Sequence, residues 1–114
     1  MAGKFVIKNA KNGQFMFNLL SGNHQVILTS ELYKSHASAV DGIESVKKNA
    51  TNAERFERRT SSNGSPYFVL KAANGLEIGR SELYTSDAGM ENGIESVMKN
   101  APEAEVRDDS AQEA

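Results

Sequence analysis

The chain has 114 residues, of which 39% are hydrophobic, and it contains nine glycines and no cysteine. This length allows one compact domain with a real core and excludes a large multidomain enzyme. Without cysteine there is no disulfide framework, thiolate metal site or cysteine nucleophile, and we expect a cytoplasmic protein.

The net charge is −2 at pH 7, and it is unevenly distributed. Residues 102–114 carry five acidic residues and one arginine, so residues 1–101 carry a surplus of two positive charges. Such a small surplus does not favour nucleic-acid binding. No apolar stretch approaches the roughly 20 residues that span a bilayer, so we expect no membrane segment and no signal peptide.

Three strands are predicted first along the chain. Apolar side chains alternate with differently facing residues over 5–7 and 15–19, which is the period of half-buried strands. Between them, Lys11-Asn12-Gly13 predicts a tight turn. A second turn is predicted over 21–24, and a β-branched run over 26–29 predicts the third strand.

A helix of roughly 12 residues is predicted next. Ala39, Ile43 and Val46 fall on one helical face, and Ser35 stands where a helix N-cap is expected. Gly42 lies within this helix, where it costs about 1 kcal/mol relative to alanine. We therefore expect the helix to approach the sheet closely at this point.

The strongest pattern is an internal repeat with a period of 51 residues. Ser30-Glu31-Leu32-Tyr33 recurs at 81–84, and Gly42-Ile43-Glu44-Ser45-Val46 recurs at 93–97. Without a gap, 23 of the 51 pairs between residues 4–54 and 55–105 are identical. This identity indicates a duplication.

We predict a single domain over residues 1–108, made of a first repeat (4–54) and a second repeat (55–105). Residues 109–114 are predicted to be a frayed acidic tail. Residues 55–59 and 105–107 are predicted to be strands that follow the two helices. Because one 51-residue unit is near the lower size limit for independent folding, we expect a monomeric, covalent pseudo-dimer.

The order of Asn-Gly, Phe-x-Phe-x-Leu, Ser-Glu-x-Tyr and Gly-Ile-x-Ser-Val-x-x-Asn-Ala resembles the YegP-like family of small bacterial proteins of unknown function. The resemblance covers residues 4 to about 107. It implies that the two units share one sheet and exchange their closing strands, and it supplies no activity. Pro66 opposite Phe15 and Gly79 opposite Leu28 depart from the pattern outside these motifs.

The predicted fold is therefore α+β. Two tandem units of three strands, a helix and a further strand share one antiparallel sheet, with both helices packed on one face.

The repeated Ser-Glu-x-Tyr segment supplies the best polar candidates for a ligand surface. An acid–base role would require a raised carboxylate pKa in a dry pocket. The alternative is that each tyrosine packs its ring on the sheet while each glutamate accepts hydrogen bonds near a helix start. The candidates are Ser30, Glu31, Tyr33, Ser81, Glu82 and Tyr84.

A second candidate is the densest basic group, at the junction of the two repeats, which would bind an anion or an RNA backbone. Glu54 and Glu57 interrupt it. Its members are Lys47, Lys48, Arg55, Arg58 and Arg59.

Other polar residues give no sign of catalysis or of a cofactor. His24 and His36 stand opposite Gly75 and Asp87 in the repeat, which disfavours a shared histidine mechanism, and we interpret both as exposed loop or cap residues. Their spacing is not that of metal ligands, and no cofactor motif is present, so no metal or cofactor is expected.

We predict a small non-catalytic binding or interaction protein of the bacterial cytoplasm, which uses a pseudo-symmetric surface built from the repeated segments. Two alternatives remain open. One is RNA or anion binding through the basic group, and the other is a low-turnover enzyme that uses the repeated Glu/Tyr pairs as acid and base.

Overall fold

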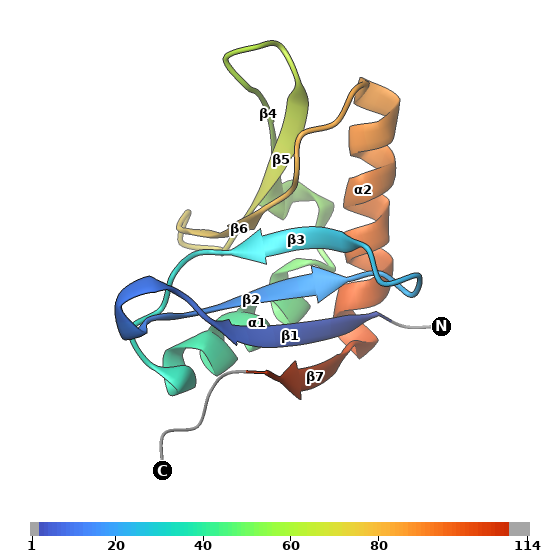
Figure 1. Cartoon of the computed structure of the whole chain (residues 1–114). Coiled ribbons are helices and arrows are strands. Elements are labelled where there is room, and N and C mark those ends of the chain that lie inside the picture. The colour runs from blue at the N-terminus through green and yellow to red at the C-terminus, as the bar shows by residue number, and fades with distance from the viewer. Residues whose placement is uncertain (1–2, 110–114) are drawn as a thin grey trace.

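A single sheet of seven strands forms the body of the molecule in a computed structural model that describes residues 3–109 (Figure 1). The strand order is β4-β5-β6-β3-β2-β1-β7. In chain order the elements are β1 (Lys4–Asn9), β2 (Phe15–Leu20), β3 (Val26–Ser30), α1 (His36–Asn49), β4 (Phe56–Thr60), β5 (Pro66–Lys71), β6 (Glu77–Arg80), α2 (Asp87–Asn100) and β7 (Glu105–Asp108).

The two repeats form the same elements in the same order, as predicted. Each is an antiparallel meander followed by a helix, and both helices have 14 residues, slightly more than expected. Ser35 Oγ accepts the N–H of Ser38 at 3.1 Å, and Ser86 Oγ accepts the N–H of Gly89 at 3.0 Å. Both serines are therefore helix N-caps.

The closing strand β7 crosses to the other repeat. It pairs with β1 in parallel, from Lys4 opposite Glu105 to Ile7 opposite Asp108. The sheet is therefore mixed, and the expectation of a wholly antiparallel sheet is wrong at this pairing. The reason is connectivity: the chain after α1 continues directly into β4, and the chain after α2 returns beside β1 in the direction of β1.

Both helices cover the same face of the sheet and share one core (Figure 1). Alternate strand residues such as Phe17 and Phe68 point into this core, where they meet Ile43 of α1 and Ile94 of α2. The opposite face carries no helix among residues 3–109 and is called the open face below. The duplicated apolar residues therefore line the helix side of the sheet.

The two histidines lie at unrelated places. His24 lies in the β2–β3 turn with a φ of 69°, where the second repeat has Gly75 with a φ of 86°. His36 begins α1, and its Nε2 lies 2.6 Å from Oδ2 of Asp108. The acidic tail predicted for 109–114 lies outside the described residues beyond residue 109.

Candidate functional site

The repeated serine of the Ser-Glu-x-Tyr segment is buried, and its hydroxyl forms a hydrogen bond to the backbone of a neighbouring strand. Ser30 Oγ accepts the N–H of Phe17 at 2.8 Å and donates to the carbonyl of Glu31 at 2.8 Å. Ser81 makes the equivalent bonds to Phe68 and Glu82, at 3.0 and 2.8 Å. Because both hydroxyls are buried and engaged, the structure gives these two candidates a role in the fold.

The repeated tyrosine lies between the sheet and the helix. Tyr33 stacks on Phe17 with ring centroids 5.9 Å apart, and the same stacking recurs between Tyr84 and Phe68 at 6.3 Å. A β-carbon at Gly42 would lie 2.7 Å from Cζ of Tyr33, which is closer than real β-carbons come. The expected close approach of the helix is confirmed, and the tyrosine ring is what requires glycine there.

The electrostatics of both phenols disfavour proton transfer. Burial raises the pKa of Tyr33 and Tyr84, and the negative charges of Glu31 and Glu82 raise each pKa further. A general acid or base works best with a pKa near the operating pH, and these shifts run away from neutrality. Each phenol therefore keeps its proton and is suited to donating a hydrogen bond.

Each tyrosine also forms part of a shallow cleft between the two repeats. The first cleft, of about 330 Å³, places Tyr33 and α1 against Leu76, Glu77 and Ile78 of the second repeat. The second cleft, of about 410 Å³, places Tyr84 against residues 25–27 of the first repeat. Residues 25–27 correspond to 76–78 by the 51-residue shift, so the two clefts share an equivalent tyrosine and an equivalent facing strand. Their other walls differ, because α1 lines the first cleft and residues 82–83 line the second.

A duplicated pair of solvent-facing residues precedes each tyrosine. Leu32 and Leu83 are each 55% exposed, and Glu31 and Glu82 are exposed as well. Leu83 and Glu82 line the second cleft. Sequence reasoning did not name the leucines as site residues, because an apolar residue between strand and helix is ordinarily counted as core. The signal available was their duplication, which packing does not explain.

The clefts combine apolar and acidic side chains. Asp41 and Glu77 line the first cleft and Glu82 lines the second, whereas the described lining residues of both include no lysine or arginine. Glu77 is already paired with Arg59 and Arg80, which leaves Asp41 as the available carboxylate of the first cleft. The apolar walls come from Leu76 and Ile78 in one cleft and from Ile27 and Leu83 in the other. Such surroundings suit a ligand with apolar and positively charged groups.

The structure does not gather the predicted basic group into one surface. Arg58 and Arg59 are neighbours on β4 and point to opposite faces of the sheet. Arg58 binds Glu91 of α2, with Nη2 and Oε1 2.7 Å apart. Arg55 Nε donates to Oδ1 of Asn49 at 3.2 Å, and Lys47 Nζ lies 6.0 Å from the ring centroid of Phe5. Lys48 is exposed on α1.

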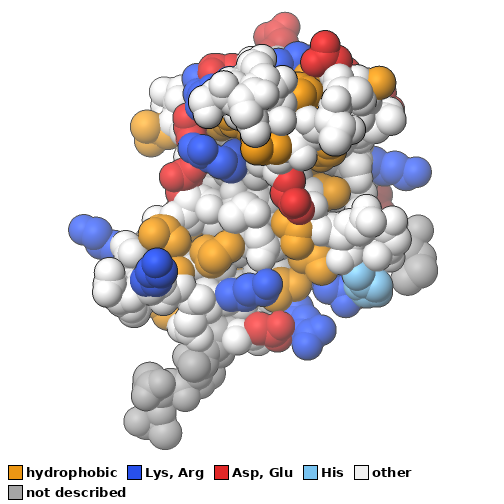
Figure 2. All heavy atoms as spheres, turned by 45° about the horizontal axis from the view of Figure 1, so that its top comes forward, with side chains coloured by type: hydrophobic (Ala, Val, Ile, Leu, Met, Phe, Trp, Pro, Cys, Tyr) orange, Lys and Arg blue, Asp and Glu red, His pale blue; other side chains and the backbone are white. Residues whose placement is uncertain are grey.

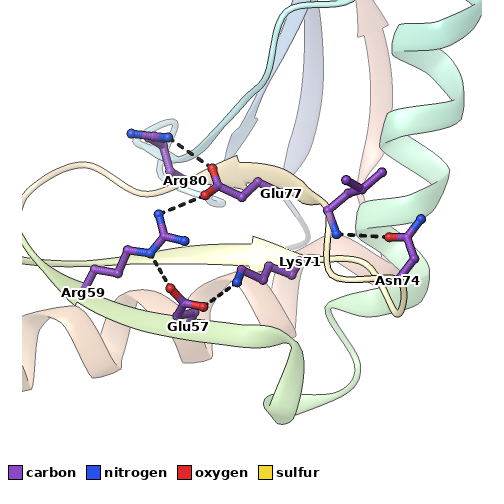
Figure 3. Close-up of polar contacts among 7 residues, drawn as sticks. Glu57, Arg59, Lys71, Asn74, Glu77 and Arg80 are labelled. Carbon is purple, nitrogen blue, oxygen red and sulfur yellow. Dashed lines mark hydrogen bonds and ion pairs between the residues drawn. The ribbon is translucent and has the colours of Figure 1, made fainter.

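Arg59 belongs instead to a chain of ion pairs on the open face (Figure 3). It binds Glu57 at 2.5 Å and Glu77 at 2.9 Å, while Lys71 and Arg80 bind the outer sides of the same carboxylates at 2.5 and 3.2 Å. Hydrogen bonds from Lys71 and Arg59 lower the pKa of the Glu57 carboxyl. Each cation in the chain therefore already has a carboxylate partner.

The open face differs between the repeats. Its second-repeat residues Glu57, Lys71 and Glu77 are charged, whereas the equivalents Val6, Leu20 and Val26 are apolar. On the side drawn in Figure 2, hydrophobic side chains lie next to lysine and arginine side chains. The apolar residues on the helix side of the sheet are therefore alike in the two repeats, while the open face has diverged.

Two geometric findings bear on other kinds of site. Among residues 3–109, no three His, Cys, Asp or Glu side chains come together as a set of metal ligands. Within the same part of the chain, neither helix has the length and apolar composition needed to cross a membrane.

These features define the class of the molecule: a tandem-repeat α+β protein in which two meander–helix units share one mixed sheet. The model of the family described as "Domain of unknown function (DUF1508)" matches residues 10–57 and 61–108. The chain belongs to this family, which confirms the resemblance seen in the sequence.

Relatives similar in sequence cover nearly the whole chain. A UPF0339 protein of Mannheimia succiniciproducens is 56% identical over 106 residues, which is 93% of this chain and 94% of the relative. The UPF0339 protein YegP of Yersinia pestis is 47% identical over 106 residues, 93% and 95% of the two chains. These relatives carry no assigned activity in their names.

Two solution NMR structures show the same fold. That of YegP from E. coli, described as a protein of unknown function, has a TM-score of 0.92 at 45% identity and covers 99% of this chain and 97% of that one. That of a UPF0339 protein from Shewanella oneidensis has a TM-score of 0.90 at 44% identity, with 96% and 93% coverage.

Proposed function

We propose that this chain is a non-catalytic binding protein of the bacterial cytoplasm, monomeric as a covalent pseudo-dimer, that holds apolar and positively charged peptide segments in its two clefts. One observation carries the proposal: an exposed Glu-Leu pair precedes the cleft tyrosine in both repeats, and Glu82 and Leu83 of the second pair line a cleft themselves. A single exposed leucine is ordinary on a protein surface. What supports a partner is that leucine occurs at both equivalent positions, and that Leu83 lies in a cleft beside Ile27. The absence of cysteine supports the cytoplasm.

The two alternatives receive less support. For an enzyme, the serine hydroxyls are engaged in buried hydrogen bonds and the tyrosine pKa values are raised. For RNA binding, Arg58 and Arg59 face opposite sides of the sheet and are paired with Glu91, Glu57 and Glu77. Two arginines on opposite faces of a sheet do not contact one phosphate backbone together.

The test is an amide-resolved NMR titration of the full chain with short peptides that combine leucine or phenylalanine with lysine or arginine. We expect shifts at Glu31–Tyr33 and Glu82–Tyr84 and at the facing residues Ile27 and Ile78. A length-matched acidic peptide should bind more weakly at both clefts, because the lining carboxylates repel it.

Leucine variants make this test specific. In Leu32→Ser combined with Leu83→Ser the fold should persist, because both side chains are exposed, and peptide binding should fall. Val106→Ser, at a 46% exposed position on β7 outside both clefts, is the matched control. Binding that the leucine pair does not change would contradict the proposal. Salt-sensitive shifts confined to Lys47–Arg59 would favour an anion or RNA instead.

A further inference from the structure

The outer edge of β4 carries no paired strand among residues 3–109. Its equivalent in the first repeat, β1, is covered along its outer edge by the parallel strand β7. The second repeat lacks such a cover because the chain that follows α1 is β4 itself. Within residues 3–109, the same strand-binding edge therefore occurs once occupied and once open.

The backbone of β4 presents its polar groups to this open edge. In the first repeat, the carbonyl of Ile7 points outward and accepts the N–H of Asp109 at 2.8 Å. Arg58 corresponds to Ile7, and the facing N–H of Phe68 is bonded to Ser81 Oγ instead of to Arg58. The Arg58 carbonyl is therefore directed to the outer edge, ready to accept a hydrogen bond from an added strand.

A hollow of about 260 Å³ lies at the end of this edge. Arg58, Thr60, Asp87 and Glu91 contribute to its lining. In the first repeat, the residue equivalent to Asp87 is His36, which binds Asp108 at the end of β7. The hollow thus corresponds to the place that the end of β7 fills beside β1.

The charges of β4 specify the strand that would fit. When the register of β7 on β1 is transferred to β4, Glu105, Arg107 and Asp108 come to lie opposite Arg55, Glu57 and Arg58 respectively. Val106 comes to lie opposite Phe56. All three charged positions are then matched by opposite charges, whereas β1 offers Arg107 and Asp108 the apolar residues Val6 and Ile7. Opposite charges across a strand pair stabilise it.

We propose that β4 binds an extended segment of a partner protein as an added parallel strand, and that this segment carries acidic, apolar, basic and acidic residues in that order. The charged side chains of β4 prevent indiscriminate pairing, as is usual for an exposed edge. The same charges select a segment with the complementary pattern. This edge is separate from the two clefts, so the proposal does not depend on them.

The probe is a capped synthetic peptide with the sequence of residues 103–109, Glu-Ala-Glu-Val-Arg-Asp-Asp. It is titrated into the isotopically labelled full chain. We expect amide shifts at Arg55–Thr60 and in the first turn of α2, and contacts between peptide and β4 protons in a parallel register. The Leu32→Ser and Leu83→Ser pair should leave this binding unchanged, which separates it from binding at the clefts.

A charge exchange provides the specific test. Arg58→Glu should weaken binding of the peptide about fivefold or more, and a peptide with arginine in place of the first aspartate should restore it. Restoration shows that the variant still folds. Lys8→Glu, which reverses an exposed charge on β1, is the matched control and should leave binding unchanged.

Four outcomes would overturn the proposal. The first is an absence of shifts at β4 with millimolar peptide, and the second is equal binding of a peptide with all charges reversed. The third is a set of shifts at Lys4–Ile7, which would mean that the peptide displaces β7. The fourth is slowed diffusion of the chain alone, which would assign the edge to a second copy of this protein.

Discussion

Gly42 lies directly against the ring of Tyr33, since a β-carbon at Gly42 would be 2.7 Å from Cζ of the tyrosine. Gly42→Ala should therefore lower the free energy of unfolding. Overpacking of this kind costs about 1–3 kcal/mol, and alanine recovers about 1 kcal/mol through its better helix propensity. We expect a net loss of about 1 kcal/mol in urea denaturation.

The control for this prediction is Gly89→Ala, at the first turn of α2. Its nearest neighbours would be Ser86 Oγ at 3.3 Å and Tyr84 Cδ1 at 3.6 Å. We expect a much smaller change there. Equal effects of the two substitutions would mean that the tyrosine ring moves aside without cost.

Ser30→Ala should destabilise the protein by about 1–3 kcal/mol, because it removes the acceptor of the buried Phe17 N–H. Ser81→Ala should have a similar effect through Phe68. Chemical denaturation of both variants measures these losses. Ser38→Ala, at an exposed position of α1, should change the stability by less than about 0.5 kcal/mol. A neutral Ser30→Ala would contradict the structural role of the repeated serine.

His24→Gly should stabilise the protein, because His24 has a φ of 69° that glycine adopts without steric cost. The left-handed conformation costs a residue with a β-carbon about 1–2 kcal/mol, partly offset by the greater freedom of glycine in the unfolded chain. We expect a gain of about 0.5–1 kcal/mol in thermal unfolding. The reverse exchange at the equivalent position, Gly75→His, should lower the melting temperature, and a rise would contradict this reasoning.

Glu57→Gln should reduce the loss of stability at acid pH. Lys71 and Arg59 lower the pKa of the Glu57 carboxyl in the folded protein, so the unfolded chain binds a proton more readily. The stabilisation is present above the ordinary glutamate pKa and is lost as the pH falls through the lowered folded pKa. Denaturation between pH 3 and 7 should therefore show that the free energy of unfolding falls less steeply at acid pH in the variant.

Glu44→Gln, at an exposed position of α1, is the control for this pH dependence. Part of the acid sensitivity should remain in Glu57→Gln, because Arg58 also lowers the pKa of Glu91. If Glu57→Gln leaves the loss of stability at acid pH unchanged, the exposed ion pairs do not lower the pKa of the Glu57 carboxyl on folding, and the prediction is wrong.

The strands and helices could be predicted from the sequence because the same pattern occurs once in each repeat. Strand alternation at Phe17 and Leu19 and helical spacing at Ile43 and Val46 agree in both copies. The direction of β7 could not be predicted in the same way. The four residues of β7 do not indicate whether the neighbouring strand runs parallel or antiparallel to them. The direction of β7 depends only on the path of the chain around α2.

The candidate site was predicted only in part, since identity between repeats does not separate folding roles from binding roles. Ser30 and Leu32 are both duplicated, yet one is buried in hydrogen bonds and the other is exposed. The basic group shows a further limit. Arg58 and Arg59 are adjacent in a strand, and adjacent strand residues face opposite sides of the sheet. Basic residues that cluster in the sequence therefore do not form one basic surface here.

The pairing of Lys4 with Glu105 joins the first and last strands of the sheet, which lie 101 residues apart in the sequence (105 − 4). During synthesis the first strand emerges early and must wait for the last one before the sheet is complete. Contacts of such large sequence separation form late because loop closure costs entropy. A ribosome-bound chain that has not yet released β7 therefore exposes the outer edge of β1 as well as that of β4, and the emergence of β7 closes one of these two edges.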